Sequence, residues 1–321
     1  MQRGGINPIE DIKTLYYLWK FFREEKPDIV HLVAIKPYLY GGLISRITGV
    51  PALVSAVSGL GTIFVSKKYK HLLVRKLLYY LYRFSFNHFN QKVIFQNKYD
   101  FELLVKWGVL DSSKAKLIKG SGVNLKNFTK FEEPRGTPVV CFAARLLKDK
   151  GIFDFVSAAK IIIDRGVRAR FIIAGELDNK NPTALTFDEF NILKKKDFVE
   201  IVGYNNDIST LYADSNIICL PSYREGLPKS LVEAAAASRA VVTTNVPGCR
   251  DAIIPNITGL LVPVKNPEKL ADALQLLIEN PKKRFAMGKA GRKLAEKEFP
   301  IQKIVKYHID IYQSLLDKKN R

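Results

Sequence analysis

NIICLPSYREGLPKSLVEAAAAS, residues 216–238, runs from a short apolar stretch through a polar turn into a helical pattern. The apolar stretch is typical of a buried parallel strand. Pro228 suits the first turn of a helix, because proline has no N–H group to leave unpaired there, and it predicts a helix beginning at this residue. A strand that leads through a loop into a helix is the repeating unit of a parallel α/β sheet.

The same unit recurs along the 321 residues, a length that suits two domains of ~150 residues each. Apolar runs predict two series of strands, separated by the polar stretch FEEPRGTP, which we interpret as a linker. We therefore expect an α/β protein with two Rossmann-like, doubly wound domains facing across a cleft. The expected segments are a first domain at 1–130, a second at 131–300, and a C-terminal helix at 301–321. The predicted strands are 28–33, 52–59 and 92–97, then 139–145, 170–175, 216–222, 240–248 and 259–263.

A formal net charge of +20 favours an anionic partner, which could be nucleic acid, an acidic membrane surface or a phosphate-bearing substrate. The segment from Ser66 to Arg83 mixes basic residues with Leu and Tyr. It is interpreted either as a basic amphipathic helix on an anionic leaflet or as a solvated helix whose apolar face meets the core. No recognition-helix, RRM-like or zinc-finger signature accompanies the charge, so we expect no nucleic-acid partner.

The spacing of the cysteines and the hydropathy of the sequence indicate the cellular compartment of the protein. Cys141, Cys219 and Cys249 are the three cysteines, and no two have C-x-x-C spacing, so neither a disulfide framework nor a zinc site is indicated. No apolar run reaches the ~18 residues of a membrane span, and the first residues lack the apolar core of a signal peptide. We expect a cytoplasmic protein that can lie peripherally at the inner face of the cytoplasmic membrane.

The stretch at 216–238 contains two carboxylates that are candidates for a binding role. Glu225 lies in the turn, and Glu233 lies among small apolar residues of the helix. A packed carboxylate needs a partner. For Glu233 three solutions remain open: two vicinal hydroxyls such as those of a ribose, a buried Lys or Arg, or exposure on the outer face of the helix. The amides from Gly226 to Ser230 form a positive helix end that suits a phosphate.

Two cations are predicted at the same edge of the sheet. AARLLKDKG places Arg145 at the end of a strand and Lys150 just before the next helix. Contacts from both to a diphosphate would neutralise a leaving group without a metal ion. The alternative is a pair of solvated loop cations.

Four ordered motifs resemble the retaining glycosyltransferases of sequence family four, which have the GT-B architecture. They are R-L-x-x-x-K-G from Arg145, VEIVGYNNDISTLYADSNIICLPSYREG, E-G-L-P-x-S-L-V-E-A from Glu225, and GCRDAIIPNITGLLVPVKNPEKLADAL. The resemblance covers essentially the whole chain. It implies that the C-terminal helix at 301–321 crosses back to the first domain, whereas the pattern alone equally allows packing on its own domain.

The resemblance also implies roles for individual residues. Arg145 and Lys150 would grip the donor diphosphate, Glu225 would contact the transferred sugar, and Glu233 would hold the ribose hydroxyls. Gly226, Leu227 and Pro228 would form a turn whose backbone contacts the sugar and the phosphates. Val202 and Gly203 would lie beside the nucleotide base.

The implied reaction transfers a hexose or an N-acetylhexosamine from a UDP-sugar with retention of the anomeric configuration. The protein would mainly stabilise the leaving diphosphate and position the reactants. No cofactor or metal ion is expected. Glu225 and Glu233 are not interpreted as the acid and base of a glycosidase.

The first half resembles the acceptor domain of a branch that extends sugars on undecaprenyl-diphosphate in bacterial surface-polysaccharide pathways. The implied acceptor is a lipid-linked saccharide. His31 matches the first histidine of an H-x-H pattern, and Val33 stands where relatives carry the second. His31 is therefore either an acceptor contact or a strand residue satisfied by hydrogen bonds. Lys36 is a candidate contact for an acceptor phosphate, against an ordinary role in a strand-to-helix turn.

The family pattern also has a strand and a glycine-rich turn before the segment that opens this chain, so the resemblance implies an N-terminally truncated, incomplete first domain. We expect an exposed sheet edge and apolar surface there. The alternative function is accordingly a nucleotide-sugar-binding remnant without turnover.

Overall fold

The computed structural model describes residues 8–60, 70–129 and 132–318, with side chains from residue 76 onward in the second of these ranges. The chain divides into two compact units, one formed by Met1–Gly120 with Lys303–Arg321 and the other by Ser121–Gln302. The first unit ends before the boundary at residue 130 that the sequence suggested. Each unit has a parallel sheet and helices, so the predicted α/β class is confirmed.

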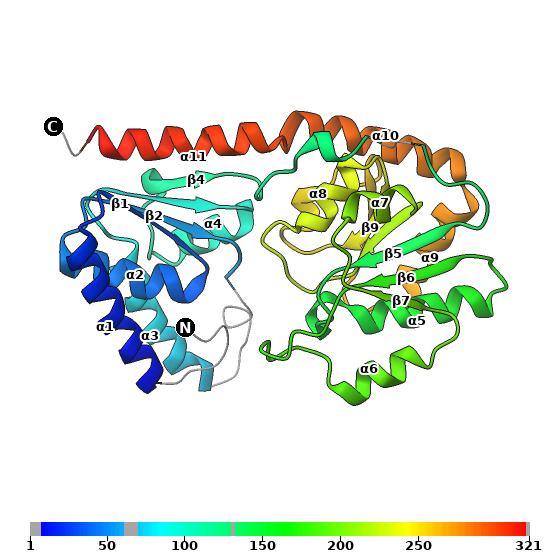
Figure 1. Ribbon diagram of the computed structural model, residues 1–321, viewed down its shortest axis with the longest axis horizontal. Helices are drawn as coiled ribbons and strands as arrows, with labels where there is room; N and C mark the ends of the chain where they lie inside the picture. The colour runs from blue at the N-terminus through cyan, green and yellow to red at the C-terminus, as the bar shows by residue number, and fades with distance from the viewer. Residues whose placement is uncertain (1–7, 61–69, 130–131, 319–321) are drawn as a thin grey trace. The chain divides into compact units, whose positions relative to one another are not determined.

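The first unit contains a four-stranded parallel sheet in the order β1-β2-β3-β4. Alternate residues of one strand face opposite sides: Leu53 packs with the helices of one face, and Val54 packs with the C-terminal helix on the other. Figure 1 shows α2 and α11 on opposite faces of this sheet. The elements are α1 (Pro8–Glu25), β1 (Ile29–Val33), α2 (Ile35–Thr48), β2 (Ala52–Val57), α3 (Lys70–Ser85), β3 (Gln91–Phe95), α4 (Lys98–Lys106), β4 (Ala115–Leu117) and α11 (Ile301–Leu316).

The C-terminal helix α11 packs on the sheet of the first unit. Ile304, Ile311 and Leu315 join the apolar cluster of β2 and β3. Asn90 donates from Nδ2 to the carbonyl oxygen of Leu315 at 2.8 Å, which fixes the end of the helix. Of the two placements considered for residues 301–321, the structure has the one on the first unit.

The second unit contains a six-stranded parallel sheet in the order β10-β9-β8-β5-β6-β7. Its apolar core is built from both faces of this sheet and the helices that cover them. The strands β4 and β7 were not predicted, because three or four residues are too few to show a period. The elements are β5 (Val139–Ala143), α5 (Ile152–Asp164), β6 (Arg170–Ala174), α6 (Phe187–Lys194), β7 (Glu200–Gly203), α7 (Ile208–Ala213), β8 (Ile217–Leu220), α8 (Lys229–Ala236), β9 (Ala240–Thr244), β10 (Gly259–Val262), α9 (Pro267–Glu279) and α10 (Pro281–Glu298).

The stretch at 131–138 was interpreted as a linker, but its described residues are fastened to the second unit. Arg284, only 7% exposed, donates from Nε to Glu133 Oε2 at 2.7 Å. The fully buried Arg239 donates from Nη2 to the carbonyl oxygen of Glu132 at 2.8 Å. Buried cations need partners, and this stretch supplies them.

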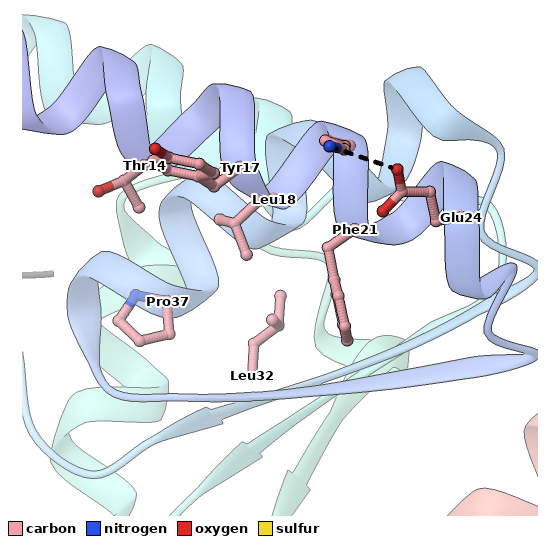
Figure 2. A pocket seen from close by; sticks show the side chains of 8 residues that line it. Thr14, Tyr17, Leu18, Phe21, Glu24, Leu32 and Pro37 are labelled. Atoms are coloured by element: carbon pink, nitrogen blue, oxygen red, sulfur yellow. Dashed lines mark ion pairs between the residues drawn. The ribbon is translucent and has the colours of Figure 1, made fainter.

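The first unit has the exposed sheet edge and apolar surface that the sequence suggested. Among the described strands, β1 pairs only with β2, and Val33 at its end is 52% exposed. A cavity of about 580 Å³ lies between α1, β1 and the start of α2. Figure 2 shows Leu18 and Phe21 of α1 pointing toward Leu32, with Pro37 beside them. Lys20 and Glu24, which also line the cavity, form an ion pair.

Candidate active site

The strand order of the second sheet brings the predicted cations and the predicted acid together. From β5 the chain continues to β6 and β7 on one side, and then returns to add β8 on the other side. The carboxyl ends of β5 and β8 therefore flank a topological switch point, where α/β sheets bind ligands. The loop after β5 carries Arg145 and Lys150, and the loop after β8 carries Glu225.

Lys150 and Glu225 form an ion pair. Lys150 Nζ donates to Glu225 Oε1 at 2.5 Å, and the two side chains are 19% and 11% exposed. A pair this poorly hydrated is stronger than a surface pair, and it fixes the ammonium group over the strand ends. The structure thus joins the predicted diphosphate contact and the predicted sugar contact.

Arg145 lies at the same edge of the sheet but has a different partner. Its Nη1 donates to Asp178 Oδ2 at 2.6 Å. Asp178, which follows β6, was not singled out from the sequence. The Arg145 side chain is 50% exposed, so its guanidinium remains accessible to a ligand.

Glycines let these loops approach one another. Gly151 has φ +75°, and a Cβ built on it would lie 2.1 Å from the carbonyl oxygen of Pro221. Gly248, which follows β9, has φ +81°, and its Cβ would lie 2.6 Å from the carbonyl oxygen of Glu225. Both positions combine a left-handed backbone with a close backbone contact, so only glycine fits without movement. The role of Gly248 was not predicted.

The turn from Gly226 to Pro228 enters α8 one residue later than predicted. Pro228 is the N-cap, with φ −70° and ψ 122°, and the helix begins at Lys229. The carbonyl oxygen of Pro228 accepts from the N–H of Leu231 at 3.2 Å. Leu227 is buried in the core, which anchors the turn that leads to the start of the helix.

Glu233 lies in α8 and is 9% exposed, which excludes the outer-face alternative. Lys229 Nζ lies 3.2 Å from Glu233 Oε1, so a lysine one turn earlier is its partner. Burial raises the pKa of the Glu233 carboxyl, and the nearby Lys229 opposes that rise. Glu233 also lines a cavity of about 540 Å³. The other lining residues come from the start of the second unit, the loop after β7 with the first turn of α7, the start of α8 and the first residue of α11. They are Ser121, Gly122, Val123, Asn124, Asn127, Phe128, Asn206, Asp207, Ile208, Ser209, Lys229 and Ile301.

Val202 and Gly203, which the resemblance places beside the nucleotide base, are the last residues of β7, immediately before the loop that lines this cavity. Val202 is 40% exposed, and Gly203 has φ +73°. The carbonyl oxygen of Gly203 accepts from the N–H of Gly175 at 2.8 Å, which ties β7 to the end of β6. Val202 and Gly203 are thus near the cavity along the chain, although they do not line it.

Glu233 gives a pH-dependent prediction. Because its pKa is raised in the folded protein, the ionised carboxylate destabilises the fold above the ordinary glutamate pKa. We expect Glu233→Gln to raise the urea midpoint at pH 7. If the carboxylate holds ribose hydroxyls, as the resemblance implies, the same change should weaken UDP binding about tenfold, since charged acceptors bind hydroxyls more strongly. The gain in stability should disappear as the pH falls below the ordinary glutamate pKa, where the wild-type carboxyl is protonated in both states. A lower midpoint at pH 7 would contradict this interpretation.

In the first unit, both acceptor candidates have protein partners. Lys36 Nζ donates to Asp11 Oδ1 at 2.9 Å, joining α2 to α1. His31 Nδ1 lies 2.7 Å from the Tyr312 hydroxyl of α11, and its ring lies 5.8 Å from that of His308. Burial, and secondarily His308, lowers the pKa of His31. The first contact joins two helices and the second joins β1 to α11, and neither candidate lines the cavity of the first unit.

Within the described ranges 8–60, 70–129 and 132–318, no group of three or more His, Cys, Asp or Glu is placed to hold a metal ion. The three cysteines are buried and unpaired with one another.

Two family models match this chain. Residues 124–294 match the family described as Glycosyl transferases group 1, and residues 2–97 match Glycosyl transferase 4-like. The chain belongs to the group 1 glycosyltransferases, and the family predicted from the sequence is confirmed.

Relatives and solved structures extend the match over most of the chain. The chain is 31% identical to the N,N'-diacetylbacillosaminyl-diphospho-undecaprenol alpha-1,3-N-acetylgalactosaminyltransferase of Campylobacter jejuni, covering 89% of this chain and 77% of the relative. It is 27% identical to the UDP-Gal:alpha-D-GlcNAc-diphosphoundecaprenol alpha-1,3-galactosyltransferase of Escherichia coli, covering 98% and 82%. Its fold is similar to that of Anabaena Alr3699/HepE in complex with UDP, with a TM-score of 0.74, 16% identity and coverage of 94% and 82%. This solved structure supports the GT-B fold.

Proposed function

We propose that the chain transfers a hexose or N-acetylhexosamine from a UDP-sugar to a lipid-linked saccharide, with retention of configuration. The observation that supports the proposal is the ion pair of Lys150 with Glu225 at the switch point of the second sheet, with Arg145 at the end of β5, the strand beside β8. The relatives' names supply the acceptor class, since both act on diphospho-undecaprenol sugars.

The proposed donor spans two adjoining regions of the second unit. Its diphosphate meets Arg145, Lys150 and the amides after Gly226, where cations and a helix N-terminus favour negative charge. Its ribose meets Glu233 in the cavity beside the loop after β7. Glu225, held by Lys150, contacts the transferred sugar.

In this mechanism the leaving diphosphate is stabilised by fixed positive charge. The cationic groups of Lys150 and Arg145 stabilise the negative charge that develops on the diphosphate, and no metal ion is required. We propose that the diphosphate oxygen also helps to remove the acceptor proton as the acceptor attacks from the same face. Glu225 then positions the sugar and orients Lys150, and it does not act as a glycosidase acid.

The test is transfer of labelled sugar from UDP-N-acetylgalactosamine, UDP-N-acetylglucosamine or UDP-galactose to a synthetic undecaprenyl-diphosphate-linked N-acetylhexosamine. We expect lipid-extractable product with at least one donor, and an unchanged rate in EDTA. Calorimetric UDP binding without any product would support the non-catalytic remnant instead. Failure to bind UDP would contradict both functions.

We also propose contact with an anionic membrane surface through α3. No described helix is long and apolar enough to cross a membrane. Residues 66–69 of the predicted basic segment lie outside the described residues, but the later turns of α3 expose Leu77 by 61% and Tyr80 by 59% beside Lys76 and Arg83. Apolar and basic side chains on one helix face suit an anionic leaflet. Flotation with phosphatidylglycerol vesicles, lost in Lys76→Glu/Leu77→Ser, tests the contact.

A further inference from the structure

The loop that carries Arg145 and Lys150 is bound along its length by residues 176–189, which we call the brace segment. The N–H of Leu146 donates to the carbonyl oxygen of Glu176 at 3.0 Å, and the N–H of Lys148 donates to that of Thr183 at 2.7 Å. Leu185 returns a hydrogen bond to Leu146 at 3.2 Å. The brace segment therefore fixes the backbone on which both cations are carried.

One side chain of the brace segment fixes the direction of Arg145. Asp178 accepts from Arg145 Nη1, and its own side chain is only 16% exposed. A turn holds Asp178, because its carbonyl oxygen accepts from the N–H of Asn181 at 2.8 Å. A guanidinium has five N–H donors, so one bond to Asp178 orients the group and leaves donors for a ligand.

A second side chain connects the brace segment to the loop of Glu225. Thr183 Oγ1 donates to Asp149 Oδ1 at 3.0 Å, sharing its proton with Asn181 Oδ1 at 2.9 Å. The carbonyl oxygen of Asp149 accepts from the N–H of Tyr223 at 2.8 Å and from the Ser222 hydroxyl at 3.1 Å. Asp149 thus joins three segments, and its neighbour in the chain is Lys150.

The helix α6 anchors the far end of the brace segment. Thr186 and Glu189 form a capping box at its start. Glu189 also accepts from Lys148 Nζ at 2.6 Å, and this contact is the leading cause of its lowered pKa. The contact between Lys148 and Glu189 therefore joins α6 directly to the loop that carries Arg145 and Lys150.

We propose that the brace segment positions Arg145 and Lys150 for a donor diphosphate, with Asp178 and Thr183 as its positioning residues. The inference rests on the proposed function and adds residues that do not themselves touch the donor. Long cationic side chains lose conformational freedom when they bind, and orientation in advance lowers that cost. Asp178 and Thr183 act through Arg145 and Asp149 respectively.

The charge of Asp178 has a competing consequence. A carboxylate near a diphosphate would repel it if the ligand had to displace the Arg145 pair, and removal of that charge would then tighten binding. Arg145 is half exposed while Asp178 is largely covered, so a ligand can reach the guanidinium without displacing the carboxylate. The geometry therefore favours weaker binding after Asp178→Asn.

The experiment compares UDP with UMP by calorimetry, because only UDP carries the second phosphate. For Asp178→Asn we expect UDP binding about tenfold weaker and UMP binding changed less than about twofold. Asp197→Asn removes the same charge from an exposed position of the second unit, outside the brace segment, and should bind both as the wild type does. Equal losses for UDP and UMP, or tighter UDP binding, would overturn the positioning role.

Two further comparisons separate positioning from general support. In an Arg145→Ala background, Asp178→Asn should cause no further loss of UDP affinity, since Asp178 acts through Arg145. Thr183→Val should lower kcat with little change in the urea midpoint, whereas Thr183→Ser, which keeps the hydroxyl, should restore it. Independent losses in the double variant, or a serine variant as slow as the valine variant, would refute the assignment. If the wild type itself does not prefer UDP to UMP, the proposed function fails instead.

Discussion

Replacing Lys150 with alanine is expected to lower kcat by about 100- to 1,000-fold, because removal of one preorganised group that stabilises developing charge costs about 3–4 kcal/mol in related settings. Lys150 Nζ is held at 2.5 Å from Glu225 and is 19% exposed, so water replaces its charge poorly. UDP affinity should fall less than the rate, since the charge on the diphosphate grows as the sugar leaves. Transfer kinetics and UDP calorimetry on the same preparation measure the two effects.

The Lys150 variant needs a control for folding, because Glu225 is left without its cation. A mostly buried, unpaired carboxylate destabilises a fold. Lys150→Met combined with Glu225→Gln removes both charges, so its urea midpoint should recover while transfer stays slow. Lys196→Ala removes the same charge from an exposed position ahead of β7 and should leave the rate unchanged. A folded Lys150→Ala protein with the wild-type rate would end the assignment of this site.

The location of the site was predictable because strand ends could be read from the sequence. Arg145 and Glu225 each follow an apolar run, and parallel strands place their carboxyl ends along one edge. The pairing of Lys150 with Glu225 was not predictable in the same way. It depends on β8 lying directly beside β5, and the order of strands across a sheet has no local signal in the chain.

Other features depended on contacts between distant residues. Asp178 is 33 positions from Arg145 and follows no motif, so its role required coordinates. The stretch at 131–138 has the composition of a linker, but the buried cations Arg239 and Arg284 draw Glu132 and Glu133 onto the second unit. The polar composition alone therefore led to the wrong interpretation of this stretch as a linker. By contrast, the start of α8 was displaced by a single residue, within the usual uncertainty of helix ends.

Gly151→Ala is expected to destabilise the second unit by about 2–4 kcal/mol, from two separable causes. Its φ of +75° disfavours any residue with a Cβ, and that Cβ would lie 2.1 Å from the carbonyl oxygen of Pro221. Neither backbone can yield alone, because Gly151 is the N-cap of α5 and Pro221 directly follows β8. Urea unfolding of the second unit measures the loss.

Gly166→Ala separates the two causes, because Gly166 has φ +77° but nothing within 4 Å of its built Cβ. It lies in the same unit, so both variants report on the same transition. We expect Gly166→Ala to cost about 1 kcal/mol from backbone conformation alone. The excess in Gly151→Ala then measures the contact between the two loops, and it should be accompanied by slower transfer because Lys150 and Glu225 move apart. Equal losses in the two variants would show that the loops can separate without cost, which the close packing of their backbones argues against.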